Sequence, residues 1–251
     1  MGSFLLMAGE KGHRIALPPK DLVRGTNTVE IHYRQAYALN GRGLHRFVDP
    51  EDKRVYLYTQ FEAFDAHQMF PCFDQPDLKA TFRMTVSAPK AWKVISSTSA
   101  IERRGVGSSR LWIFPESAKM STYLFSLIAG PYYEWRSRAG GVPLGLFARQ
   151  SFKKYVTARD WFAPTRAGFK FFPDYFGTPY PFKKYDQVIE PEFTSGAMEN
   201  IAAVTFGESY VSRGHVTRDE REALAETILH EMAHMWFGDL VTMRWFNDVW
   251  M

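Results

Sequence analysis

The sequence predicts an α+β protein in which a β-rich part, residues 1–133, precedes a part that contains long helices, residues 134–251. Two observations carry this prediction. Short alternating or apolar runs follow one another up to residue 128 and are separated by Gly, Pro and Ser, as in antiparallel sheets. From residue 155 onward, apolar side chains recur at helical spacing. No flexible linker separates the two parts, so we expect them to pack together.

The first part contains six stretches that we interpret as strands of an antiparallel saddle or sandwich. In residues 28–33, Val29, Ile31 and Tyr33 alternate with polar side chains, which is typical of a half-buried strand. The other expected strands are residues 55–58, 81–86, 93–96, 110–114 and 123–128.

The second part should open with a hairpin and a helix. Strands at 132–135 and 144–147 would be joined across the turn Gly140–Gly141. Helical spacing then extends over 155–176, where Pro164 would mark a break or a new first turn because proline has no N–H to donate.

Two further strands are expected at 185–189 and 201–206, on either side of an irregular segment, residues 190–200. Strands followed by a metal-binding helix would suit the core of a zinc peptidase. In such a core, an edge strand can pair with an extended peptide through main-chain hydrogen bonds.

The last predicted helix has signals at both ends. Thr217 and Glu220 form the Ser/Thr-x-x-Glu pattern of a capping box. Gly238 would stop the helix after roughly twenty residues. We interpret residues 224–240 as a helix that is apolar nearly all round, interrupted by His230, Glu231 and His234.

Those three residues point to a metal. His230 and His234 are four residues apart, so their rings project from the same face of a helix. Two such imidazoles can bind one zinc ion, while Glu231 between them faces a metal-bound water as general base. The alternative is a buried amphipathic helix that carries two histidines by coincidence. Burying three polar side chains without partners is costly, which favours zinc.

Composition excludes some classes of function. The chain has 251 residues, 45% of them hydrophobic, which is enough for a substantial core. The formal charge of +4 arises from 31 basic and 27 acidic residues spread along the chain, with no basic block of the kind that binds nucleic acid. The single cysteine, Cys72, excludes an internal disulfide and fits a reducing, cytoplasmic compartment. Residues 2–8 are too short for a signal sequence or a membrane span, and no other run reaches eighteen apolar residues.

The motifs of the second part resemble those of the aminopeptidase N family of zinc peptidases. Residues 230–242, with Trp245 after them, are similar to its zinc signature, and residues 196–200 (Gly-Ala-Met-Glu-Asn) match its exopeptidase motif letter for letter. Residues 59–62, 70–76 and 179–186 also fit. The similarity runs from about Tyr58 to the last residue with its motifs in the expected order. It implies a β domain followed by a thermolysin-like zinc-peptidase domain that removes N-terminal residues from peptides.

The resemblance assigns roles by position. Glu231 would be the general base, and His230 and His234 would bind a single zinc ion. Glu199 would bind the free α-amine of the peptide, with Glu62 as a second carboxylate. The remaining substrate-binding residues would be Gln60 near the amine and Gly196, Ala197 and Met198 along the peptide backbone. A charged N-terminus requires fixed carboxylates near the metal, so this arrangement would exclude internal peptide bonds.

The third zinc ligand of the family is a glutamate, separated from the second histidine by eighteen residues. Counted from His234, it would fall at position 253, two beyond Met251. The β domain also starts late, so the resemblance implies an internal fragment that is itself inactive. If position 253 is not the ligand, Glu226, Asp239 and Asp248 are the alternatives. Departures from the family pattern at His67, Gln75 and Phe246 touch none of the expected ligands.

Three other functions remain open. A zinc endopeptidase would leave Glu199 and Glu62 without a purpose. A non-catalytic peptide-binding or scaffold protein would not need Glu231. A nucleic-acid binder has only the modest net charge behind it. The preferred N-terminal residue and the oligomeric state are not predicted by the sequence.

Overall fold

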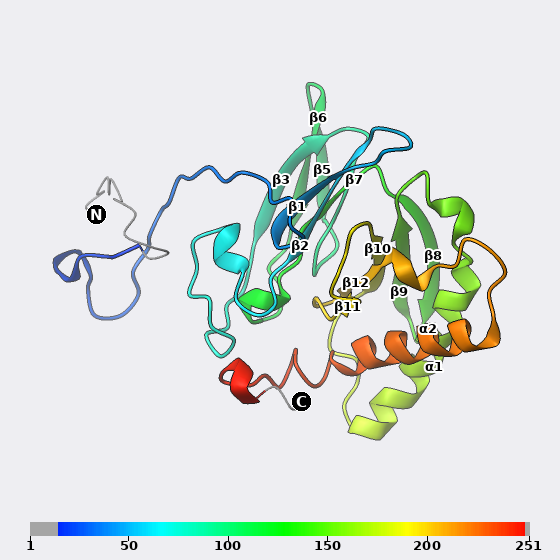
Figure 1. Cartoon of the computed structure of the whole chain (residues 1–251). Coiled ribbons are helices and arrows are strands. Elements are labelled where there is room, and N and C mark those ends of the chain that lie inside the picture. The colour runs from blue at the N-terminus through cyan, green and yellow to red at the C-terminus, as the bar shows by residue number, and fades with distance from the viewer. Residues whose placement is uncertain (1–14, 249–251) are drawn as a thin grey trace.

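The computed structural model describes residues 15–248 and contains three β-sheets and two long helices (Figure 1). The first part forms a four-stranded sheet in the order β1-β2-β7-β4 and a three-stranded sheet in the order β3-β6-β5, and every pair of neighbours is antiparallel. The predicted antiparallel, β-rich first part is therefore confirmed. Its strands are β1 (Gly43–Val48), β2 (Val55–Gln60), β3 (Met84–Pro89), β4 (Lys93–Ile95), β5 (Glu102–Val106), β6 (Ser109–Phe114) and β7 (Ile128–Gly130).

The second part is built on a mixed five-stranded sheet in the order β11-β12-β10-β9-β8. The predicted hairpin is confirmed: β8 (Tyr133–Ala139) and β9 (Val142–Ala148) are antiparallel and turn through Gly140 and Gly141. β10 (Tyr185–Glu190) is parallel to both β9 and β12 (Ala203–Gly207). The short β11 (Ala197–Met198) is antiparallel to β12 and forms the edge. The predicted boundary between residues 133 and 134 stays a prediction.

Two helices pack against each other beside this sheet (Figure 1). They are α1 (Ala158–Phe176) and α2 (Arg218–Ala233). A Cβ atom on Gly168 of α1 would lie 2.5 Å from the sulfur of Met232 on α2, so glycine is needed where the helices approach. The predicted break at Pro164 is wrong, because α1 continues through it and through Pro173. Proline interrupts single hydrogen bonds, and the packing of the helix compensates for their loss.

Short 3-10 turns connect the longer elements. They are η1 (Pro19–Asp21), η2 (Ala66–Gln68), η3 (Thr122–Leu124), η4 (Lys153–Tyr155), η5 (Glu208–Tyr210) and η6 (Phe246–Asp248). A continuous set of buried aliphatic and aromatic side chains runs through both parts of the chain, including Tyr58, Phe61, Leu146 and Phe206, which are 0% exposed. The two parts thus share one core.

Two predicted strands are wrong. Residues 28–33 form no strand, and Val29, Ile31 and Tyr33 are 48%, 41% and 52% exposed. Their alternation is real, but within the described residues no neighbouring strand pairs with them. Residues 123 and 124 end η3, residues 125–127 form no regular element, and residue 128 begins β7. All six residues are buried, and a short buried apolar run does not by itself indicate which element it forms.

Other predicted strands differ in their bounds. The strand expected at 81–86 begins three residues later, at Met84. The sequence analysis also missed β1, β5 and β11, the last of which lies in the segment predicted to be irregular. The remaining strands lie at the expected positions.

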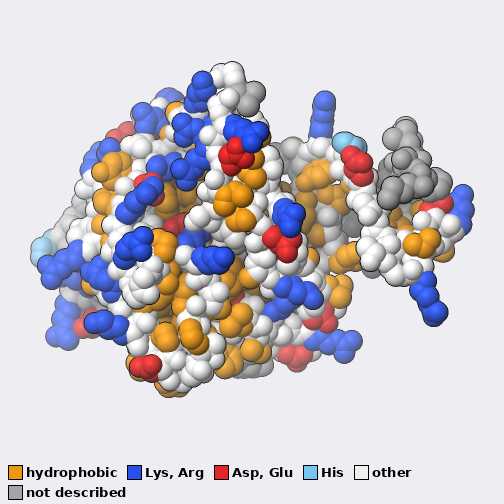
Figure 2. Space-filling view, turned by 180° about the vertical axis from the view of Figure 1, so that it is seen from behind, with side chains coloured by type: hydrophobic (Ala, Val, Ile, Leu, Met, Phe, Trp, Pro, Cys, Tyr) orange, Lys and Arg blue, Asp and Glu red, His pale blue; other side chains and the backbone are white. Residues whose placement is uncertain are grey.

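The surface carries charges of both signs. On the face shown in Figure 2, Lys and Arg side chains are interspersed with acidic and hydrophobic ones. Among residues 15–248, neither helix combines the length and the apolar character that crossing a membrane requires.

Candidate metal and amine-binding site

The helix that carries the histidines begins as the sequence predicts. The Thr217 side chain accepts a hydrogen bond from the Glu220 N–H at 3.2 Å. In return, Glu220 Oε2 accepts one from the Thr217 N–H at 2.7 Å. The Thr217 N–H, together with the Thr217 hydroxyl that donates to the same Oε2 atom at 2.9 Å, lowers the pKa of Glu220. Both halves of the capping box are therefore present, and they fix where α2 starts.

The end and the character of this helix differ from the prediction. α2 ends at Ala233, so His234 is its C-cap and Gly238 lies in the turn that follows. That turn is closed by the Asp239 N–H, which donates to the His234 carbonyl at 3.0 Å. The helix is also not apolar all round. Its buried residues lie along one stripe and are Leu224, Ile228, Glu231 and Met232.

The two histidines converge on one point. His230 Nε2 and His234 Nε2 are 3.2 Å apart. Two imidazoles bound tetrahedrally to one zinc ion at about 2.05 Å would have their nitrogens roughly 3.3 Å apart. His234 Nδ1 lies 2.8 Å from the Phe237 carbonyl, to which it can donate, which leaves Nε2 free as a ligand. The pair therefore fits a zinc ion.

Gly238 makes this orientation of His234 possible. Its φ is +118°, and a Cβ atom there would lie 3.1 Å from His234 Nδ1. The glycine thus allows the chain to turn tightly around the imidazole, which is a different role from the helix stop that the sequence suggested.

A complete set of metal ligands is not present in the described part of the chain. Within residues 15–248, no three His, Cys, Asp or Glu side chains are grouped so that they could hold a metal ion. Glu226, Asp239 and Asp248 therefore do not complete the histidine pair as placed here. Position 253 lies beyond the sequence, so that ligand stays a prediction.

Glu231 lies between the histidines and faces inward. It is 5% exposed, and its Oε2 atom has no hydrogen-bond partner among the described residues. Burial, together with the negative charges of Glu199 and Glu62, raises the pKa of Glu231 to about 9. A buried carboxylate without a partner is costly, so this position suits a cation or a polar ligand beside it.

A small pocket next to the histidines brings the two predicted amine-binding carboxylates together. Glu62 follows β2 of the first part, and Glu199 follows β11 of the second. Both line the same pocket as His234, and the remaining lining residues are Tyr123, Gly238, Met243 and Phe246. Burial raises the pKa of Glu199, and Glu62 adds to the rise, although the nearby histidines oppose it. The pocket is therefore rich in carboxylates, and none of the described Lys or Arg residues lines it.

The other predicted substrate-binding residues lie beside this pocket. Gln60 Nε2 donates to Ser195 Oγ at 3.1 Å, which places the end of β2 against the segment before Gly196. Gly196 has a φ of +78° and accepts a hydrogen bond from the Gly207 N–H at 2.7 Å. Ala197 and Met198 form the edge strand β11, where Met198 is 1% exposed. The Met198 side chain thus packs into the core, so only its backbone is available at the edge.

Sequence reasoning missed three residues that line the pocket: Tyr123, Met243 and Phe246. Tyr123 lies in the run that we predicted to be a strand, and nothing in its local pattern distinguishes it. Phe246 packs edge-on against Tyr123, with the ring centres 5.4 Å apart. Only contact across more than a hundred residues reveals this part of the site.

Comparison with known proteins defines the class. The family model described as the Peptidase M1 N-terminal domain matches residues 6–124, and the Peptidase family M1 domain matches residues 162–251. A β-rich N-terminal domain is thus followed by part of a peptidase domain, which confirms the predicted fold class.

Curated relatives agree with this assignment. The chain is 48% identical to Aminopeptidase N of Streptomyces lividans over 95% of its own length and 28% of that relative. It is 33% identical to Aminopeptidase N of Acetobacter pasteurianus over 93% of its own length and 67% of that protein. The chain belongs to peptidase family M1. It spans between about a quarter and two thirds of the length of these relatives.

Proposed function

We propose that the protein of which this chain is part is a zinc-dependent aminopeptidase, which releases N-terminal amino acids from peptides. The observation that carries this proposal is the pocket in which Glu62 and Glu199 lie beside His234. Carboxylates fixed next to a metal-binding histidine suit a substrate that presents an ammonium group one carbon away from the bond to be cleaved. The relatives named aminopeptidase support the same activity.

Each residue of the site would have a separate role in this reaction. Glu199 and Glu62 bind the α-ammonium of the substrate, while the edge strand β11 offers main-chain groups to the peptide backbone. Zinc, when held by His230, His234 and a third ligand, supplies Lewis-acid chemistry that activates water and polarises a carbonyl. Glu231 accepts the proton of the attacking water and passes it to the leaving amine. Fixing the amine also fixes the distance from the scissile bond to Glu231.

The test compares free and blocked substrates, using a form of the protein that extends beyond position 253. An aminoacyl-arylamide should be hydrolysed, and its N-acetylated analogue should not. Acetylation removes the positive charge and leaves Glu62 and Glu199 without a cationic partner. Equal rates on the two substrates would instead favour a zinc endopeptidase. Absence of hydrolysis in a protein with stoichiometric zinc would favour a peptide-binding scaffold.

A further inference from the structure

The amine pocket is divided between the two parts of the chain, so its geometry depends on how the parts are held together. Glu62 is attached to β2 of the four-stranded sheet, whereas Glu199 is attached to β11 of the five-stranded sheet. A shift of one sheet against the other would separate the two carboxylates. Some structural feature must therefore fix the relative position of β2 and β11.

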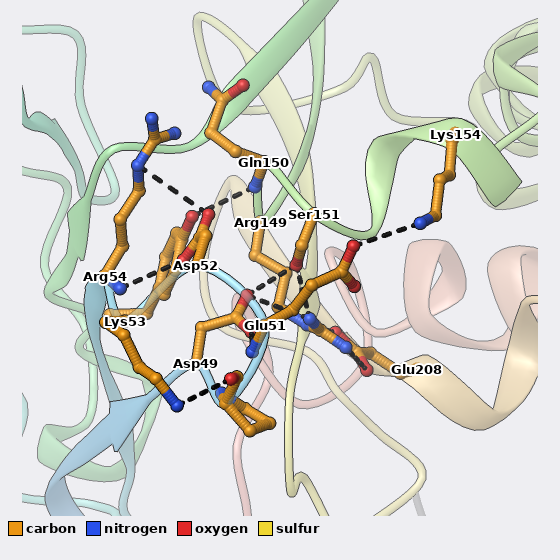
Figure 3. A network of polar contacts seen from close by, with 12 residues as sticks. Asp49, Glu51, Asp52, Lys53, Arg54, Arg149, Gln150, Ser151, Lys154 and Glu208 are labelled. Atoms are coloured by element: carbon orange, nitrogen blue, oxygen red, sulfur yellow. Dashed lines mark hydrogen bonds and ion pairs between the residues drawn. The ribbon is translucent and has the colours of Figure 1, made fainter.

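Arg149 lies at this junction and contacts both sides (Figure 3). Its Nη1 atom donates to Asp49 Oδ2 at 2.9 Å. Its Nη2 atom donates to Glu208 Oε2 at 3.0 Å, and its Nε atom donates to the other oxygen of Glu208. Ser151 also contacts both Arg149 and Asp49. The side chains of Arg149 and Asp49 are only 8% and 0% exposed, so solvent screens this pair little.

Each carboxylate that Arg149 binds is connected, through a neighbouring strand, to one of the two glutamates of the amine pocket. Asp49 lies in the turn between β1 and β2, where its N–H donates to the Arg54 carbonyl at 2.9 Å, and β2 then runs to Gln60 and Glu62. Glu208 directly follows Gly207 of β12, whose N–H donates to the Gly196 carbonyl at 2.7 Å, just before β11 and Glu199.

A neighbouring contact reinforces the junction. The Gln150 N–H donates to the hydroxyl of Tyr56 on β2 at 2.9 Å, so the chain segment that carries Arg149 is also fixed directly to β2. The guanidinium forms a planar fork that binds two carboxylates in fixed directions, which a lysine cannot do.

We propose that Arg149 is a positioning residue for the amine site: its buried bridge between Asp49 and Glu208 fixes β2 against β12 and β11, so that Glu62 and Glu199 converge. This inference rests on the proposed aminopeptidase function. It assigns Arg149 no contact with substrate and no step in the reaction.

The test uses Arg149→Lys in a form of the protein that extends beyond position 253. The substitution keeps the positive charge, but a lysine cannot donate to Asp49 and Glu208 in the fixed directions of the guanidinium. KM for an aminoacyl-arylamide should rise between about 10- and 100-fold, with kcat changing less, because displacement of the two carboxylates weakens binding of the substrate ammonium. The dissociation constant of L-leucinamide from the metal-free protein should rise by the same factor, whereas N-acetyl-leucinamide should bind equally weakly to parent and variant.

Lys154→Met is the matched control. Lys154 lies five residues further along and pairs with Glu51 at 3.1 Å (Figure 3), but both side chains are more than half exposed. KM and leucinamide binding should stay at the parental values.

A folded Arg149→Lys variant with parental KM and parental leucinamide binding would overturn the inference. If that variant does not fold, the triple variant Asp49→Asn, Arg149→Met, Glu208→Gln leaves no buried charge unpaired and is measured in its place with the same criteria. A parent protein that does not distinguish free from acetylated amines would refute the proposed function instead.

Discussion

Gln60 donates a hydrogen bond to Ser195 across 135 residues of sequence, from the end of β2 to the segment that leads into β11. The motif that contains Gln60 is therefore in contact with the residue directly before the motif of residues 196–200. Neither motif alone could form the pocket, because Glu62 follows a strand of the four-stranded sheet and Glu199 follows a strand of the five-stranded sheet. The site requires the complete junction between the two parts.

The first prediction concerns Glu231→Gln in a form of the protein that extends beyond position 253. Turnover should fall by about 10²–10⁴-fold because glutamine cannot accept the proton. Zinc content should be unchanged, since His230 and His234 keep their convergent geometry. Activity assays and metal analysis of the same preparation check this. Near-parental turnover, or loss of the metal, would contradict the role of general base.

The second prediction concerns the capping box. Thr217→Ala should destabilise the protein by about 1 kcal/mol, within a range of roughly 0.5–2 kcal/mol, because the Glu220 N–H loses its acceptor. For a chain of this length, that corresponds to a Tm lower by about 2–4 °C. Thermal unfolding followed by circular dichroism measures it.

Thr227→Ala is the control on the same helix. Its hydroxyl only donates back to the Ala223 carbonyl, at 3.0 Å, and alanine is the better helix former. Its Tm should stay equal or rise slightly. An equal loss at both positions would show that the cap itself is unimportant.

Sequence reasoning succeeded where the signal was local. The capping box and the spacing of His230 and His234 depend on contacts within one or two helical turns, and both have the predicted geometry. The failures depend on distant partners. Val29, Ile31 and Tyr33 alternate as a strand should, but no described strand pairs with them. Tyr123 and Phe246 meet across the pocket without any shared local pattern.

The third prediction concerns Glu190, at the end of β10. Its carboxyl group is 0% exposed, accepts a hydrogen bond from the Tyr132 hydroxyl at 2.7 Å, and has no cation among its described partners. Burial raises its pKa well above the ordinary value of 4.5, and the negative charge of Glu208 adds to the rise, while the Tyr132 hydrogen bond opposes it.

The direction in which stability changes with pH follows from this raised pKa. Above pH 4.5 the unfolded chain releases the proton that the folded chain retains, so the free energy of unfolding decreases as pH rises toward the folded-state pKa.

The side chain that Glu190→Gln introduces stays neutral in both states and still accepts the hydrogen bond from the Tyr132 hydroxyl. The variant should therefore gain stability over the parent, by more at pH 8 than at pH 5. Urea unfolding at both pH values measures the difference. A difference that shrinks with pH would contradict the assignment.

The last prediction concerns zinc binding by residues 1–251. Two convergent imidazoles hold the ion, but no carboxylate among the described residues is placed to complete the set and to offset the double charge. The chain should therefore lose most of its zinc on dialysis, whereas a form that includes position 253 should retain one ion per molecule. Metal analysis after dialysis against a weak chelator tests this without any activity assay.

His234→Ala should abolish even the weak binding, while His215→Ala, at an exposed position before α2, should not change it. Stoichiometric zinc in residues 1–251 would mean that another side chain moves to complete the set, and Asp239, which is buried and has no hydrogen bond to its carboxylate in the described structure, would then be the first to replace.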